Sequence, residues 1–132
     1  ELARIYNYLF QSERKQFAIV HSLDGYDEVS LTGDFKLYTT KGEELAGADS
    51  FGLQMLQQRD IYGGSTIEQA AKLFTNVLEG SGDKAQENVV LANAALAIQC
   101  YNPNKELIDC VEEARASLES KSALGVLKKV TK

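Results

Sequence analysis

A short apolar run, Phe17-Ala18-Ile19-Val20, constrains the fold of this chain more than any other stretch of its sequence. This run comes directly after a predicted helix. The apolar side chains of residues 2–10 repeat at the spacing of one helical face, and the helix is expected to end near Ser12 to Lys15. A continuous apolar run of this length is typical of a strand buried on both faces of a sheet. A helix followed by such a strand is half of a parallel crossover unit, so the sequence predicts an α/β fold.

Residues 28–46 add β-forming segments that are separated by turn signals. Apolar and polar residues alternate over 29–32, and a second β-prone run extends from Phe35 to Thr40. Gly33-Asp34 lies between the two runs and Lys41-Gly42 follows the second. We therefore expect two or three short strands here, added to the sheet in antiparallel orientation.

Residues 47–64 show no clear period and are expected to form a loop, after which the pattern becomes helical. Ser65, with Glu68 three residues later, is a capping-box signature for the start of a helix. Gly80 and Gly82 follow the last apolar residue at helical spacing and are expected to end this helix.

Three more helices are expected to follow. The first begins near Asp83 and is apolar nearly all round over residues 89–98, as in a helix enclosed on most sides. Asn102-Pro103-Asn104 should end it and cap the next, and the last should extend over about Ser122 to Lys129. The sequence thus predicts an α/β domain over residues 1–132. Its sheet would be partial and mixed, a parallel core strand plus short antiparallel strands, followed by about four carboxyl-terminal helices.

The charge balance argues against a nucleic-acid partner. The chain has 14 Lys and Arg against 19 Asp and Glu, giving a net charge of −5. Its nearest approach to a basic patch is Lys128, Lys129 and Lys132, which fall in the expected last turn of a helix. Cations there complement the backbone carbonyls and the helix dipole, so these lysines need no nucleic acid to explain them.

Nothing in the sequence indicates a membrane partner or secretion. No apolar run approaches the length of a membrane span, and no charged-then-apolar signal segment opens the chain. Cys100 and Cys110 belong to no CxxC pair and have no nearby histidine, so we expect reduced, half-buried thiols rather than a disulfide or a zinc site. We expect a cytoplasmic protein, and because the chain begins in full helical stride without Met, we expect it to be a piece of a longer one.

The segment from His21 to Ser30 is the first candidate for chemistry, because it gathers Asp24, Asp27 and Glu28 around a glycine between two strand-like runs. Acidic residues in a turn are often only solvated turn formers, and on spacing alone this is the commoner explanation. The functional alternative is a Mg²⁺ site. Mg²⁺ prefers one or two carboxylates together with waters and substrate phosphates, and Asp27 and Glu28 could supply the carboxylates.

His21 and Ser81 are weaker candidates for functional residues. His21 is the only histidine, so it could be a general base, but at the end of a buried strand a hydrogen-bonded structural role is the favoured interpretation. Ser81, in Gly80-Ser81-Gly82, lacks the Lys-Ser/Thr pair of a phosphate-binding loop and is interpreted as part of a helix stop. No arrangement of serine, histidine and acid suggests a nucleophilic triad.

Several of these segments resemble a known family, the anthranilate phosphoribosyltransferases. Residues 21–30 are similar to its "HG-x-DGLDE-hydrophobic-S" segment, and Phe51-Gly52 to the core of its Pro-Glu-Asp-Phe-Gly-like run. Gly63-Gly64, Val77-Leu78-Glu79-Gly80 and residues 89–95 resemble its closing helices. The resemblance extends along the whole chain but covers only the carboxyl-terminal portion of the family's α/β catalytic domain.

The resemblance implies a function for the acidic turn. In the family, an Asp-Glu pair that matches Asp27 and Glu28 binds Mg²⁺ with phosphoribosyl diphosphate, and the enzyme joins anthranilate to that substrate in tryptophan biosynthesis. It implies no catalytic residue or organic cofactor site in this chain, because the diphosphate loop and the anthranilate positions lie upstream. It also implies a homodimer formed through a helical domain that is absent here, and a fragment that is inactive alone.

The chain departs from the family pattern at a few positions. Ser22 replaces a glycine, Tyr26 replaces the more frequent leucine, and Glu68-Gln69-Ala70-Ala71 replaces a Glu-Asn-Ala run. None of these changes removes a carboxylate. Two alternatives remain open from the sequence, a nucleoside phosphorylase of related fold and a non-catalytic relative that binds nucleic acid.

Overall fold

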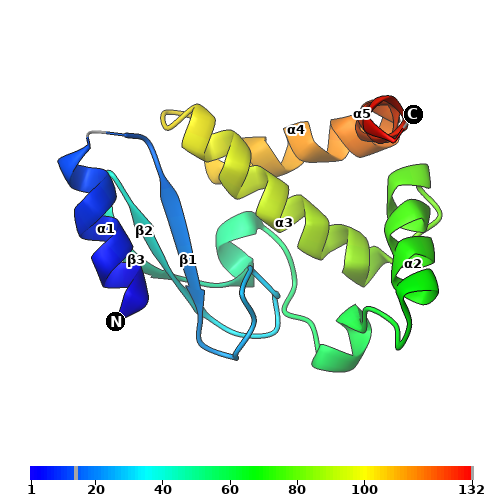
Figure 1. The fold of residues 1–132 in the computed structure, drawn as a ribbon, viewed down its shortest axis with the longest axis horizontal. Helices are drawn as coiled ribbons and strands as arrows, with labels where there is room; N and C mark the ends of the chain where they lie inside the picture. Colours follow the sequence, from blue (N-terminus) through cyan, green and yellow to red (C-terminus); the bar gives the residue numbers. More distant parts are fainter. Residues whose placement is uncertain (14, 132) are drawn as a thin grey trace.

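The computed structural model of the chain describes residues 1–13 and 15–131. A small sheet and α1 occupy one end of the molecule, and α3 crosses its middle toward α2 at the other end, with α4 and α5 along one side (Figure 1). In chain order the elements are α1 (Leu2–Ser12), β1 (Ala18–Ser22), β2 (Phe35–Thr39), β3 (Gly42–Ala46), the 3₁₀ turns η1 (Ala48–Phe51) and η2 (Gln58–Ile61), α2 (Ile67–Glu79), α3 (Lys84–Tyr101), α4 (Leu107–Glu119) and α5 (Ser122–Val130).

The described strands form one antiparallel sheet in the order β1-β2-β3. Val20 pairs with Leu37 and Ser22 with Phe35, while the β2–β3 hairpin closes at Thr39 and Gly42. The expected parallel pairing is therefore wrong for the described residues, and β1 is an edge strand rather than an enclosed one. Residues 18–20 are accordingly half-buried, because α1 and the core cover the strand's faces while no described strand covers its outer edge.

The strand expected at residues 29–32 is also wrong. Residues 31–33 bend instead, because Leu31 has a positive φ of 62°, which no strand residue adopts. This bend turns the chain so that Val29 and Leu31 are both only 1% exposed. Alternation of apolar residues here reflects two side chains entering the core from a loop.

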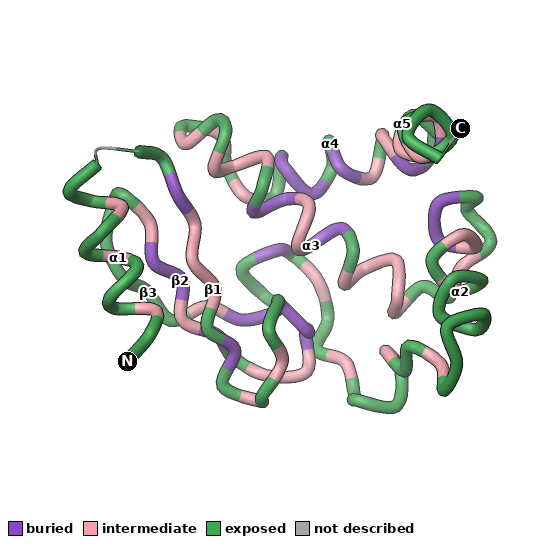
Figure 2. Tube along the Cα trace, in the orientation of Figure 1, coloured by how far each residue is buried: buried purple, intermediate pink, exposed green. Residues whose placement is uncertain are grey.

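The hydrophobic core is centred on α3. Leu91, Ala92 and Ala95 are fully buried, and α4, whose Cys110 and Val111 are buried in the same core, packs along α3. Figure 2 shows the middle of α3 as buried or half-buried, while most of α1 and α2 is exposed. The expectation that residues 89–98 form an enclosed helix is confirmed, because the alanines allow neighbouring elements to approach closely.

The helix boundaries follow the sequence signals with two shifts. Asp83 caps α3 by accepting a hydrogen bond from Ala85 N at 2.9 Å, as expected. At α2 the N-cap is Thr66 rather than Ser65, because the Thr66 hydroxyl accepts from Gln69 N. Asn102-Pro103-Asn104 ends α3 but does not cap α4, whose N-cap is Glu106.

Three further expectations concern the end of α2, the loop that follows the sheet and the last turn of α5. α2 ends at Gly80, which adopts a left-handed conformation (φ 75°), so the interpretation of Gly80-Ser81-Gly82 as a helix stop is confirmed. Within the expected loop, η1 and η2 add two short 3₁₀ turns. Lys128 and Lys129 lie in the last turn of α5, as expected, whereas Lys132 of the same cluster lies outside the described residues.

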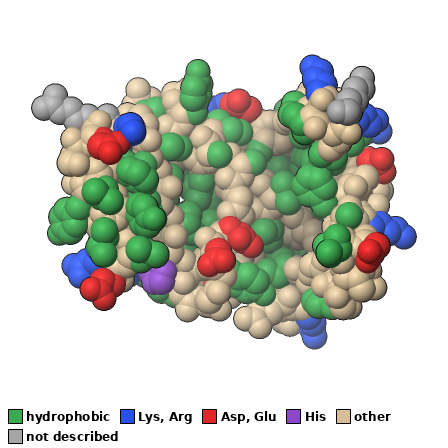
Figure 3. All heavy atoms as spheres, in the orientation of Figure 1, with side chains coloured by type: hydrophobic (Ala, Val, Ile, Leu, Met, Phe, Trp, Pro, Cys, Tyr) green, Lys and Arg blue, Asp and Glu red, His purple; other side chains and the backbone are tan. Residues whose placement is uncertain are grey.

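The surface is partly apolar over α1. This helix has no buried residue, and Leu2, Ile5 and Leu9 are each more than half exposed. Figure 3 shows the hydrophobic side chains gathered over α1 on this face of the molecule. In the described residues, no helix combines the length and the apolar character that crossing a membrane requires.

Candidate metal site at the acidic turn

The acidic turn begins where β1 ends at Ser22, at the lower end of that strand in Figure 1. The structure brings the three predicted carboxylates into one turn but places them in two environments. Asp24 is half-buried, whereas Asp27 and Glu28 are exposed. The half-buried carboxylate therefore differs in its surroundings from the two exposed ones.

Asp24 faces inward and braces the turn. Its Oδ2 atom accepts hydrogen bonds from the hydroxyls of Ser30 and Thr32, both at 2.6 Å, and its Oδ1 atom accepts a longer one from Tyr26 N at 3.4 Å. Burial alone would raise the pKa of Asp24, but these hydrogen bonds outweigh it and hold the pKa below its ordinary value of 3.8. These hydrogen bonds tie Asp24 to Ser30 and Thr32, so Asp24 braces the fold of the turn.

Asp27 and Glu28 differ from Asp24 because their side chains are exposed. In the part of the chain that the structure describes, neither carboxylate takes part in an ion pair. No group of three metal-ligating side chains exists among the described residues. Two adjacent exposed carboxylates nevertheless fit Mg²⁺, which takes its other ligands from water and substrate phosphate. The residues present therefore suit Mg²⁺ and do not suit a zinc site, which takes four protein ligands or three.

The backbone beside this pair is held from two other elements. The hydroxyl of Ser22 on β1 donates to the carbonyl oxygen of Glu28, and the side-chain amide of Asn93 on α3 hydrogen-bonds Val29. Sequence reasoning did not find Asn93. The available signal was the single amide within the apolar stretch 89–98 of this helix, since a buried amide must find partners.

Leu31 marks the far end of the same segment. A left-handed conformation is costly for a residue with a bulky side chain and persists only where the surroundings impose it. Here the Leu31 side chain is buried and its carbonyl oxygen accepts a hydrogen bond from Leu56 N at 2.8 Å. The loop that follows the acidic pair is therefore fixed by the core as well as by Asp24.

His21 does not have the expected buried structural role. It is exposed, because the alternation along β1 directs Ser22 inward and His21 outward, opposite Lys36 of β2. The interpretation of His21 as a hydrogen-bonded structural residue at the end of a buried strand is therefore wrong. Cys100 and Cys110 are both free, as expected, but the expected half-burial holds only for Cys100, because Cys110 is buried.

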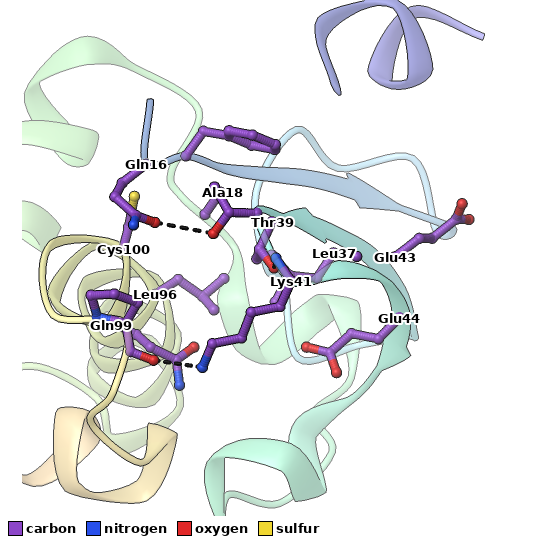
Figure 4. A pocket seen from close by; sticks show the side chains of 14 residues that line it. Gln16, Ala18, Leu37, Thr39, Lys41, Glu43, Glu44, Leu96, Gln99 and Cys100 are labelled. Atoms are coloured by element: carbon purple, nitrogen blue, oxygen red, sulfur yellow. Dashed lines mark hydrogen bonds between the residues drawn. The ribbon is translucent and has the colours of Figure 1, made fainter. Parts of the chain in front are cut away.

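A pocket of about 280 Å³ lies away from the acidic turn, between the β2–β3 hairpin and the carboxyl end of α3 (Figure 4). Lys41 crosses it and donates to the carbonyl oxygen of Pro103 at 2.6 Å, and Thr40 donates to Gln16 at 3.1 Å. No residue of the acidic turn lines this pocket. It is therefore separate from the candidate metal site.

The sequence model of one family, described as "Glycosyl transferase family, a/b domain", matches residues 1–124. The chain belongs to this family. It is similar to the anthranilate phosphoribosyltransferase of Bacteroides thetaiotaomicron, with 46% identity over 128 residues, which are 97% of this chain and 39% of that protein. It is likewise similar to that of Cytophaga hutchinsonii, with 47% identity over 132 residues, which are 100% of this chain and 40% of that protein.

Solved structures of the family share the fold. An anthranilate phosphoribosyltransferase from Saccharomyces cerevisiae in complex with PRPP and Mg matches with a TM-score of 0.83 and 22% identity, covering 96% of this chain and 37% of that one. The enzyme from Thermus thermophilus matches with a TM-score of 0.81 and 22% identity, covering 93% and 37%. The expected α/β class and the resemblance to this family are confirmed. The chain spans about two fifths of the length of these relatives.

Proposed function

We propose that this chain is the carboxyl-terminal portion of the α/β domain of an anthranilate phosphoribosyltransferase, a cytoplasmic enzyme of tryptophan biosynthesis. Such an enzyme joins the nitrogen of anthranilate to ribose carbon 1 of phosphoribosyl diphosphate and releases diphosphate. The relatives that support this proposal carry that name. The observation within the chain that supports it best is the exposed Asp27–Glu28 pair on a braced turn.

Within this proposal, Asp27 and Glu28 would hold Mg²⁺ for the diphosphate of the substrate. Mg²⁺ bound by these carboxylates would supply positive charge for the leaving diphosphate, which is electrostatic catalysis without a protein nucleophile. Asp24 keeps the turn folded while remaining outside the metal's ligand set. The diphosphate loop, the anthranilate site and the helical domain that would form a homodimer all belong to the rest of the enzyme, so this chain alone should not turn over substrate.

The test is a Mg²⁺ titration of turnover in the full-length enzyme. The double variant Asp27→Asn/Glu28→Gln keeps side-chain size and removes both charges, so we expect kcat/KM to fall on the order of a hundredfold. The matched control is Glu43→Gln/Glu44→Gln, which neutralises another adjacent acidic pair, on β3. Its exposed Glu43–Lys36 ion pair contributes little to stability, so the control should keep its activity.

The metal assignment and the substrate assignment would be refuted by different results. An unchanged rate and an unchanged Mg²⁺ requirement in the Asp27→Asn/Glu28→Gln variant would refute the metal assignment. Turnover of phosphoribosyl diphosphate with a nucleobase in place of anthranilate would instead refute the substrate assignment and leave the metal site intact.

A further inference from the structure

The peptide group between Glu28 and Val29 is held at both of its poles by side chains from two distant elements. Ser22 on β1 binds its carbonyl oxygen, and Asn93 on α3 binds its N–H group. We propose that Ser22 and Asn93 are positioning residues for the Asp27–Glu28 metal pair. This inference rests on the metal site of the proposed function and extends it to two residues outside the acidic turn.

Ser22 supplies the first anchor. It is one of the two buried polar residues of the described chain, with 6% of its surface exposed, and its hydroxyl donates to the Glu28 carbonyl oxygen. A buried hydroxyl needs such a partner, and the carbonyl needs a donor in return. A glycine at this position, as in the family segment that residues 21–30 resemble, has no hydroxyl and could not form this anchor.

Asn93 supplies the second anchor and uses its whole side-chain amide to do so. Its Oδ1 atom accepts from Val29 N at 3.1 Å, while Nδ2 donates to Val29 O at 2.8 Å and to Val89 O at 2.9 Å. The opposite orientation of the amide would set N–H against N–H and carbonyl against carbonyl, so the contacts define one orientation. Because Val89 lies one turn earlier on α3, the amide is itself fixed to the helix.

These anchors act on the direction of the Glu28 side chain. A peptide group is planar, so fixing its carbonyl and its N–H fixes the plane and thereby restricts rotation about the bond between the Glu28 α-carbon and its carbonyl carbon. The Val29 side chain, only 1% exposed, anchors the same point in the core. The backbone that carries the exposed Glu28 carboxylate is thus fixed to both β1 and α3.

Preorganisation of this kind should appear in metal affinity. Groups that orient metal ligands without touching the metal commonly change its affinity by about 10- to 100-fold when they are removed. We expect the loss of either anchor to weaken metal binding by about tenfold, because the pair would then have to be ordered at the expense of binding free energy.

The experiment titrates the full-length enzyme with Mn²⁺, a paramagnetic ion that replaces Mg²⁺, and measures the concentration of free Mn²⁺ by electron paramagnetic resonance. The test variants are Ser22→Ala and Asn93→Ala, and Ser22→Thr is the conservative variant that keeps the hydroxyl. The matched control is Asn88→Ala, which removes another half-buried amide of α3 that makes no hydrogen bond to the acidic turn. All titrations are run where urea unfolding shows every variant to be folded.

We expect Ser22→Ala and Asn93→Ala to bind Mn²⁺ about tenfold more weakly, and Ser22→Thr and Asn88→Ala to bind as the wild type does. Equal affinity of the wild type, Ser22→Ala and Asn93→Ala would overturn the positioning inference while leaving the metal site in place. Equal affinity of the wild type and Asp27→Asn/Glu28→Gln would overturn the metal site itself. If Asn93→Ala does not fold, the comparison of Ser22→Ala with Ser22→Thr decides the question.

Discussion

Gly33 lies directly against Asp24, so closely that a β-carbon on Gly33 would stand 3.1 Å from the carboxylate atom Oδ2. This spacing is tighter than an ordinary van der Waals contact, and the carboxylate cannot withdraw without lengthening its hydrogen bonds to Ser30 and Thr32. The brace of the acidic turn therefore requires a residue without a side chain at position 33.

The first prediction concerns this contact. Gly33→Ala should lower the free energy of unfolding by about 1–3 kcal/mol, as overpacking does in a well-packed site. The control Gly63→Ala adds the same methyl group where nothing lies within 4 Å, and it should be neutral or slightly stabilising. Urea unfolding measures both, and equal stabilities for the two variants would contradict the role of the contact.

The second prediction concerns the pH dependence of stability through Asp24. Its folded-state pKa is below the ordinary value of 3.8, so the ionised carboxylate stabilises the fold above about pH 4. That contribution is lost as the pH falls through the folded-state pKa. The stability difference between the wild type and Asp24→Asn should therefore be constant above about pH 5 and narrow below about pH 4.

The matched control for this pH series is Glu79→Gln, at the exposed carboxyl end of α2. Thermal unfolding of the three proteins from neutral to acidic pH provides the measurement. A gap between wild type and Asp24→Asn that stays constant down to the lowest pH would show that Asp24 does not brace the turn as an anion.

The third prediction concerns the core beneath the site. Phe51 is 1% exposed, and its ring centroid lies 5.9 Å from that of Phe35 on β2. Phe51→Ala should cost about 3–5 kcal/mol of unfolding free energy, through lost burial and the cavity left behind. Phe74→Ala, on the exposed face of α2, removes a ring that is 54% exposed and should cost far less, so similar losses in the two variants would contradict this assignment of the core.

The fourth prediction concerns the two thiols. Burial raises the pKa of Cys110, so its reactive thiolate form is scarce and sheltered in the fold, whereas Cys100 is half-buried. A thiol reagent applied to the native chain should therefore modify Cys100 first and Cys110 only on unfolding. Peptide mapping after brief labelling identifies the modified residue, with Cys100→Ser as the control that should abolish the fast phase.

The helical half of the chain could be predicted well because its signals are local. Asp83 caps a helix through the residue two positions later, and Gly80 ends one through its own conformation, so the information lies within a few residues. The predicted cap of α2, Ser65, lies one residue before the observed cap, Thr66. Both residues carry a hydroxyl, and only the folded course of the backbone shows which one accepts the hydrogen bond.

The sheet and the acidic turn could be predicted only in part, because distant contacts determine them. Val29 and Leu31 have the alternation of a strand, yet they lie in a loop. Leu31 has a left-handed conformation, and the amide of Asn93, 64 residues after Val29, binds the backbone of Val29. The sequence located the three carboxylates of the turn. It could not separate Asp24 from Asp27 and Glu28, since that distinction depends on which hydroxyls the folded loop brings to Asp24.

The attachment of Val29 to α3 sets the order in which parts of the molecule come apart. Surface turns ordinarily open long before the rest of a protein does. Here the residue that follows the acidic pair is fastened to the helix that carries Leu91 and Ala92, both fully buried. On warming, the end of the turn at Val29 should therefore keep its shape until α3 itself is lost, so that the carboxylates retain their arrangement up to the melting of the whole chain.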